Sequence, residues 1–224
     1  MKRTPLAERA LPEYTRGEEI TNMVTHIVGG VLGIVALVLC PIQGARHHDP
    51  YAVVSGAIYG FSMLVLYAIS SVYHGLSPRL KGKKVLQVID HCTIYFLIAG
   101  SYMPVTLCSI RPISPAWGWT LFGLVWALTA VAATLTAIDL KKYEKFSMVC
   151  YLLMGWCVVV RIDLVYRSLG PKGFALLVAG GLFYTLGAVL YALGKKRRYM
   201  HAAFHVFVVI GSLLQFLCML LYVL

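Results

Sequence analysis

Three histidines in this sequence stand at helical spacings that suit metal binding. The segment His201-Ala-Ala-Phe-His205 places two imidazoles four residues apart, and residues at this spacing share one face of a helix. The segment Ser70-Ser-Val-Tyr-His74 ends on a third imidazole, with Ser70 on the same helical face. Ionisable side chains inside apolar runs are costly in a bilayer and usually mark a functional site. The alternative for His201 and His205 is a position among lipid headgroups at a basic interface.

Asp90 is the carboxylate best suited to act with these histidines, because three neutral imidazoles and one open position describe a catalytic zinc centre. We expect water in the open position, with its pKa lowered by the metal towards about 7. Asp90 would orient this water or take its proton, and its charge would offset part of the metal charge. Ser70 would either hydrogen-bond a developing oxyanion or bond back to a carbonyl of its own helix. Imidazole also binds other transition metals, and zinc is favoured because it is common and redox-inert.

The composition places these residues in a membrane protein. Hydrophobic residues make up 59% of the chain and charged residues only 13%, and a soluble fold of this size cannot bury so much apolar surface. The residues before Ile20 lack an apolar core, so no signal peptide is expected. The six cysteines stand singly, without a CxxC pair, which argues against a disulfide framework and a thiolate zinc site.

Seven segments are long and apolar enough to cross a bilayer, which takes about 20 residues each. They cover residues 24–42, 51–76, 85–107, 116–138, 146–165, 173–193 and 201–224. The short connections predict antiparallel neighbours in one all-α bundle. We therefore expect a single seven-transmembrane domain over residues 1–224, with residues 1–20 as a short cytoplasmic segment.

Basic residues alternate between the two ends of the predicted bundle. They concentrate in the N-terminal segment and in the second, fourth and sixth loops: Lys2, Arg3, Arg9, Arg16; Arg79, Lys81, Lys83, Lys84; Lys141, Lys142, Lys145; Lys195, Lys196, Arg197, Arg198. Positive charge favours the cytoplasm, which predicts a cytoplasmic N-terminus and an external C-terminus. The second helix then ends, and the third and seventh begin, on the cytoplasmic side. The three histidines and Asp90 consequently share one depth.

These residues, together with two further motifs, resemble the hemolysin III family, the bacterial branch of the progestin and adipoQ receptor superfamily. The further motifs are Glu18-Glu19-x-x-Asn22-x-x-Thr25-His26 and an Asp90-His91-Cys92 run that continues to Ile98-Ala-Gly-Ser-Tyr-x-Pro104. The resemblance covers almost the entire chain. It implies seven helices around a zinc ion bound by His74, His201 and His205, with Asp90 reaching the metal through water and Ser70 as the matching serine.

Several other polar positions also lead to expectations. His26 opens the first helix, where it either acts near the site or lies at the interface. His91 follows Asp90 and lies about 100° round the helix, so we expect it behind the site or in packing. We expect Asp139 to be a solvated loop charge, and Arg161 and Asp163 to pair locally or reach the membrane surface.

Backbone features also lead to expectations. The acidic pair Glu18-Glu19 would either favour a helix start or contact the neighbouring basic loops. Pro104 should kink or break the third helix unless neighbouring groups satisfy the freed carbonyl. Glycines spaced four apart, such as Gly29 and Gly33 or Gly56 and Gly60, should allow close helix approach.

The function favoured by these observations is a zinc-dependent hydrolase in the bacterial inner membrane that cleaves a lipid amide or acyl bond at the cytoplasmic leaflet, with a ceramide-like substrate as one candidate. The alternative is a receptor-like or membrane-homeostasis protein with structural zinc. A cytolysin ranks last, because a released toxin should be soluble before insertion. The net charge of +11 lies in short loops, which favours membrane lipids over nucleic acid as partners. The oligomeric state stays open.

Overall fold

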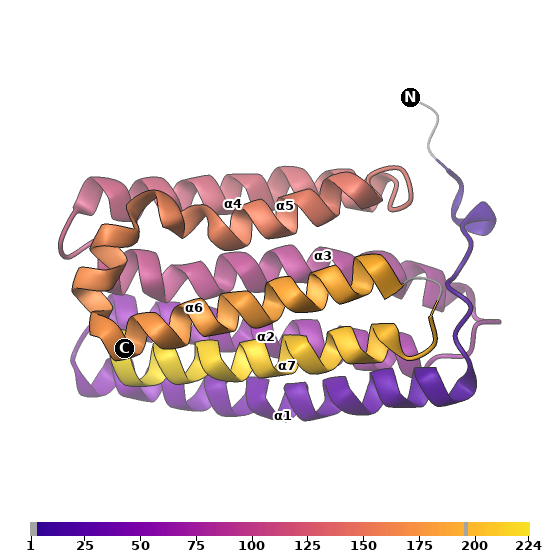
Figure 1. Cartoon of the computed structure of the whole chain (residues 1–224), viewed down its shortest axis with the longest axis horizontal. Coiled ribbons are helices and arrows are strands. Elements are labelled where there is room, and N and C mark those ends of the chain that lie inside the picture. Colours follow the sequence, from indigo (N-terminus) through magenta and orange to yellow (C-terminus); the bar gives the residue numbers. More distant parts are fainter. Residues whose placement is uncertain (1–3, 195–196) are drawn as a thin grey trace.

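Seven α-helices run side by side in a computed structural model that describes residues 4–194 and 197–224 (Figure 1). They are α1 (Arg16–Arg46), α2 (Pro50–Gly75), α3 (Lys81–Pro104), α4 (Pro115–Ile138), α5 (Glu144–Trp156), α6 (Ile162–Gly194) and α7 (Met200–Cys218). Two short 3-10 segments, Leu6–Glu8 and Cys157–Arg161, and two π-helical segments, Val105–Ile110 and Met219–Val223, complete the described structure. The basic residues Lys2, Arg3, Lys195 and Lys196 lie outside the described residues.

Six helical stretches of the described chain are long and apolar enough to cross a membrane. This confirms the all-α membrane bundle, although the expected number of separate stretches was seven. The difference arises at Glu144–Gly194, which is continuous over 51 residues. α5 ends at Trp156 rather than near residue 165, because the 3-10 segment Cys157–Arg161 replaces its last turns. Figure 1 shows the chain running along the bundle as α5 and returning as α6.

The turn between these two directions includes Gly170, whose φ of 64° lies in the left-handed region that favours glycine. A straight helix of 51 residues would be about 77 Å long, at 1.5 Å per residue. That is more than twice the hydrocarbon thickness of about 30 Å. The stretch therefore has enough length for two crossings.

Pro104 is the last residue of α3, and the backbone continues as the π-helical segment Val105–Ile110. Proline has no N–H to donate, so the α-helical ladder of hydrogen bonds cannot continue unchanged through it. The Thr106 hydroxyl donates to the Tyr102 carbonyl at 2.7 Å in this region. The helix therefore changes its hydrogen-bonding pattern at Pro104 without breaking, since Lys81–Ile110 is one continuous helical stretch.

Glycines bring α1 and α2 into close contact, as their spacing predicted. A Cβ at Gly33 would lie 2.8 Å from the backbone of Leu64, and one at Gly60 would overlap the backbone of Leu37. A side chain at either position would force the helices apart. This packing holds α1 firmly beside α2, from whose last turn His74 projects.

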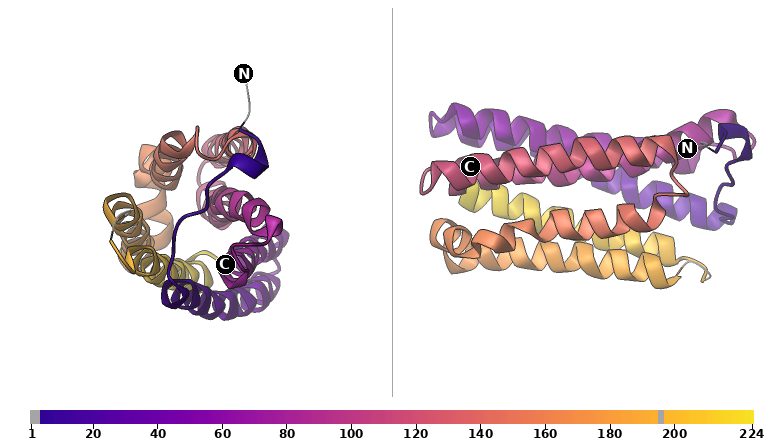
Figure 2. Two further views of the ribbon diagram at one scale, coloured as in Figure 1. Left: turned by 90° about the vertical axis from the view of Figure 1, so that its right-hand side faces the viewer. Right: turned by 90° about the horizontal axis from the view of Figure 1, so that it is seen from above.

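The N-terminal segment crosses one end of the bundle, as the end-on view in Figure 2 shows. Its far anchor is Asp139, whose carboxylate accepts hydrogen bonds from the Thr4 backbone N–H (3.0 Å) and hydroxyl (2.7 Å). Arg9 adds a bond to the Ile138 carbonyl at 2.8 Å. These donors lower the pKa of Asp139 from 3.8 to about 2. The expectation of a solvated loop charge was wrong, because Asp139 is only 3% exposed.

Candidate metal centre

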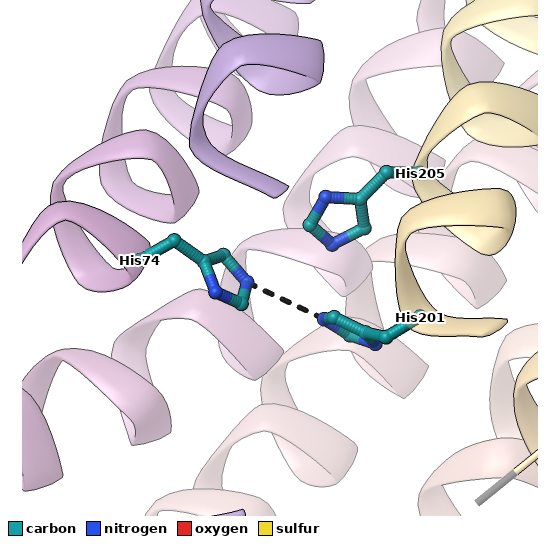
Figure 3. Close-up of side chains that lie close together, drawn as sticks. All are labelled: His74, His201 and His205. Carbon is teal, nitrogen blue, oxygen red and sulfur yellow. Dashed lines mark hydrogen bonds between the residues drawn. The ribbon is translucent and has the colours of Figure 1, made fainter. Parts of the chain in front are cut away.

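The three predicted histidines converge at the end of the bundle that the N-terminal segment crosses. His74 projects from the last turn of α2, and His201 and His205 project from the first turns of α7 (Figure 3). One ligand atom from each lies within 4.8 Å of those of the other two. The Nε2 atoms of His74 and His201 are 3.3 Å apart. Nitrogens from three imidazoles this close together can bind one transition-metal ion.

Hydrogen bonds at Nδ1 of His74 and His205 leave Nε2 of each ring free to bind a metal. The Nδ1 atom of His74 lies 2.6 Å from a carboxylate oxygen of Glu19, and Nδ1 of His205 lies 3.2 Å from the Asn22 carbonyl oxygen. Both partners only accept, so each Nδ1 carries the proton and each Nε2 keeps a free lone pair. Metal-binding histidines are usually oriented in this way.

Glu19 also binds Lys83, which connects the centre to α3. The Lys83 ammonium donates to the second oxygen of Glu19 at 2.6 Å and to the Leu76 carbonyl at 2.8 Å. Lys83 is only 1% exposed, and the Glu19 carboxylate is its charged partner. Sequence reasoning missed both roles, since Lys83 was counted only as a loop charge. The signal was present in the expectation that the acidic pair contacts a basic loop.

Glu18, the other member of the acidic pair, starts α1 instead. It forms a capping box with Thr15, in which each side chain bonds the other residue's backbone N–H. Its carboxylate also accepts from the backbone N–H of Tyr199 at 2.8 Å, immediately before α7. Both expectations for the acidic pair are therefore confirmed, because Glu18 starts the helix and Glu19 contacts the basic residue Lys83.

Asp90, Ser70 and His91 line the same cavity as His201 and His205. The Ser70 hydroxyl is buried and has no hydrogen-bond partner among the described residues, so it does not bond back to its own helix. His91 Nδ1 lies 2.8 Å from the Gln87 carbonyl oxygen of its own helix, and the residue lines the cavity rather than lying behind it. Asp90 is outside the group of close ligand atoms, and its expected contact through water stays a prediction.

The cavity extends from these polar residues into the apolar interior. Its volume is about 210 Å³, whereas one buried water needs roughly 10–15 Å³. Residues of α3, α5, α6 and α7 line it, among them Ile94, Ile98, Leu152, Val178 and Phe204. The cavity is therefore polar beside the histidines and apolar over most of its lining.

Tyr14 covers the centre on the side of the N-terminal segment. Its ring stacks on His201 with centroids 5.1 Å apart and an interplanar angle of 17°, and it lies 5.9 Å from the ring of His74. Burial raises the pKa of the Tyr14 phenol, so the phenol stays neutral. No pattern in the sequence indicated this residue, because only the path of the N-terminal segment brings it to the centre.

His26 was expected either near the site or at the interface, and the structure places it at the site. Its ring lies parallel to that of His205, with centroids 3.6 Å apart, and meets Tyr67 edge-on at 5.0 Å.

At the opposite end of the bundle, Arg161 and Asp163 pair with each other at 2.9 Å, which confirms the expected local pair.

These features define a class of protein: a multi-pass helical membrane protein with a buried three-histidine group at the end of an apolar cavity. A sequence model described as haemolysin-III related matches residues 14–216. The chain belongs to this family, as its motifs predicted.

Named relatives agree with this assignment. The chain is 39% identical to Hemolysin-3 of Bacillus cereus over 207 residues, covering 92% of both proteins. It is 38% identical to the Hemolysin-3 homolog of Bacillus subtilis, covering 93% of this chain and 96% of that protein. It is also 21% identical to the adiponectin receptor protein of Drosophila melanogaster, covering 88% of this chain and 49% of the receptor. Homology thus extends across the superfamily.

Proposed function

We propose that this protein is a zinc-dependent hydrolase that cleaves an amide or acyl bond of a membrane lipid, such as a ceramide-like molecule. The observation that carries the proposal is that two members of the three-histidine group, His201 and His205, line an apolar cavity that Asp90 and Ser70 also line. A purely structural metal site is usually closed by four protein ligands, whereas three leave a position for water. The apolar lining matches a lipid chain.

The donor set fits zinc as the ion. Three neutral imidazoles suit it, and the Nδ1 protons of His74 and His205 are held by Glu19 and the Asn22 carbonyl, so that Nε2 faces the centre. When bound, zinc would act as a Lewis acid that lowers the pKa of a water. His74, His201 and His205 would hold it.

The remaining steps belong to residues of this chain. Asp90 takes a proton as the water oxygen adds to the carbonyl carbon of the lipid. It returns this proton to the leaving nitrogen or oxygen as the bond to the carbonyl carbon breaks. The unpaired Ser70 hydroxyl donates a hydrogen bond to the oxygen that gains negative charge. The apolar cavity holds the chain and excludes bulk water.

The proposal also includes the orientation in the membrane. The alternation of basic loops supports a cytoplasmic N-terminus, an external C-terminus and separate crossings by α5 and α6. The centre then lies at the cytoplasmic leaflet of the inner membrane.

A receptor-like or membrane-homeostasis role with structural metal is the second candidate. The homology with a protein named adiponectin receptor favours it, and so does the network of Glu19 and Lys83 that ties three helices together around His74. A cytolytic role is suggested only by the names of the family model and of the two Bacillus relatives. The exposed apolar surface of the helices argues against a soluble released toxin.

A lipid-hydrolysis screen on purified protein separates these candidates. Ceramide-like and phospholipid substrates are assayed for released fatty acid, with metal content measured on the same samples. The hydrolase proposal expects about one zinc per chain and turnover that His74→Ala abolishes. A zinc-loaded wild type that cleaves none of these lipids would favour the receptor-like role.

A further inference from the structure

Unpaired polar atoms gather around the three-histidine group. Among the described residues, the buried side-chain atoms without a hydrogen-bond partner include Asn22 Oδ1, both ring nitrogens of His26, Ser70 Oγ and His201 Nδ1. Buried polar groups are almost always hydrogen-bonded, because leaving them unpaired is destabilising. Such a concentration at one place indicates that something outside the chain supplies the missing partners.

His26 differs from the other members of this set. The Asn22 amide nitrogen lies 3.4 Å from His74 Nδ1, and His201 Nε2 lies 3.3 Å from His74 Nε2. Both nitrogens of His26 are unpaired, although the residue is only 4% exposed. Its ring is fixed between His205 and Tyr67, so it cannot easily turn away to find water elsewhere.

The position of His26 argues against the simplest alternative, a fourth metal ligand. The group of ligand atoms within 4.8 Å of one another contains His74, His201 and His205 but not His26. His26 instead lines the cavity, close to where the polar end meets the apolar lining. A group bound there would lie beside the metal centre without occupying it.

We propose that His26 binds substrate, by hydrogen-bonding a neutral, oxygen-bearing head group of an amphiphile whose chain fills the apolar cavity. This rests on the proposed function and adds a specificity-determining residue to it. A neutral imidazole offers one donor and one acceptor, which matches a hydroxyl or an amide. A neutral head is favoured over a carboxylate because Asp90 lines the same cavity and would repel a second negative charge.

Binding without turnover tests this role. Trp156 lines the cavity, so bromine atoms on a bound chain should quench its fluorescence. The other three tryptophans, Trp117, Trp119 and Trp126, are replaced by phenylalanine. The probes are 9,10-dibromooctadecan-1-ol and 9,10-dibromooctadecane, which differ only in the hydroxyl and cannot be hydrolysed at an acyl bond. Zinc content is measured on every sample.

The variants separate hydrogen bonding from shape. His26→Phe keeps an aromatic ring against His205 but removes both nitrogens, and it should weaken binding of the alcohol at least tenfold while leaving the hydrocarbon unchanged. His26→Gln restores a donor and an acceptor and should recover part of the difference. If His26→Phe does not fold, His26→Leu takes its place.

Three results would overturn the role of His26. Unchanged alcohol binding in His26→Phe would show that its nitrogens do not contact the head group. An equal loss for both probes would show an effect of shape alone. Loss of zinc would assign His26 to the metal centre instead. A wild type that binds the alcohol through His26 yet hydrolyses no lipid would contradict the proposed reaction and leave the binding role intact.

Discussion

Replacing Glu19 by glutamine tests the network behind the metal centre. The carboxylate now accepts from His74 at 2.6 Å and from Lys83 at 2.6 Å, and the substitution removes its charge while preserving its size. Groups that orient a metal-binding histidine are typically worth 10–100-fold in metal affinity. We therefore expect Glu19→Gln to weaken zinc binding by this factor, equivalent to about 1.4–2.7 kcal/mol.

The same substitution should destabilise the metal-free protein for a separate reason. Lys83 is only 1% exposed, and without Glu19 its charge keeps only the Leu76 carbonyl as a partner. Breaking a buried ion pair on one side costs about 3–5 kcal/mol. Because the Glu19 side chain is 14% exposed, water can enter, and we expect a loss near the lower end, about 3 kcal/mol.

A double variant separates these two effects. In Glu19→Gln/Lys83→Met the unpaired charge is gone, so the unfolding temperature of the metal-free protein should recover while the deficit in zinc affinity remains. Zinc affinity is measured by competition with a chromophoric chelator, and stability by thermal unfolding in detergent. Glu13→Gln, at an exposed position of the N-terminal segment, is the matched control. Wild-type zinc affinity in Glu19→Gln would refute the orienting role of Glu19.

Further predictions concern the ligands, the proton acceptor, the N-terminal segment and the topology. His205→Ala should lower zinc content and unfolding temperature together, because metal binding contributes to folding; full occupancy would remove it from the ligand set. Asp90→Asn should retain most of the zinc but reduce lipid hydrolysis by roughly 10²–10⁴, and a wild-type rate would exclude it as the proton acceptor. The contact of Asp139 with the N-terminal segment requires the carboxylate, whose pKa falls from 3.8 to about 2 on folding. The contribution of this contact to stability is therefore present above a pH of about 4 and is lost as the pH falls through about 2. At neutral pH, Asp139→Asn should speed amide hydrogen exchange in the N-terminal segment. An unchanged exchange rate would contradict the role of Asp139 as an anchor. A cysteine at Lys81 should react with an impermeant reagent only from the cytoplasmic side and one at His48 only from outside, and the reverse pattern would invert the topology.

The sequence was sufficient to predict the convergence of the three histidines. Two of them share one helical face through their spacing in the sequence, and the alternating directions of the helices bring the third to the same end. Both arguments depend on local periodicity and on the order of the helices. Neither needs the identity of a contact between distant residues, and the structure places the three ligand atoms within 4.8 Å of one another.

Features that depend on individual long-range contacts were not predictable in this way. Asp139 follows an apolar helix and has the sequence context of a loop charge, but it is buried by Thr4, 135 positions earlier. Trp156, where α5 ends, also has a distant partner, because it donates a hydrogen bond to Thr185 of α6 at 2.9 Å. Apolar composition measures only whether a segment tolerates lipid, and it carries no signal for where the backbone turns.

Lys83 shows that the number of basic residues in a loop does not predict which of them are buried. The topology argument treats every basic loop residue alike, since each resists transfer across the membrane. Burial depends instead on whether a partner lies within reach, and Glu19 of α1 lies 2.6 Å from the ammonium of Lys83 on α3. One residue can therefore contribute to the orientation of the bundle and also stabilise the histidine beside it. The charges at this end of the molecule consequently support both the proposed topology and the geometry of the proposed metal centre.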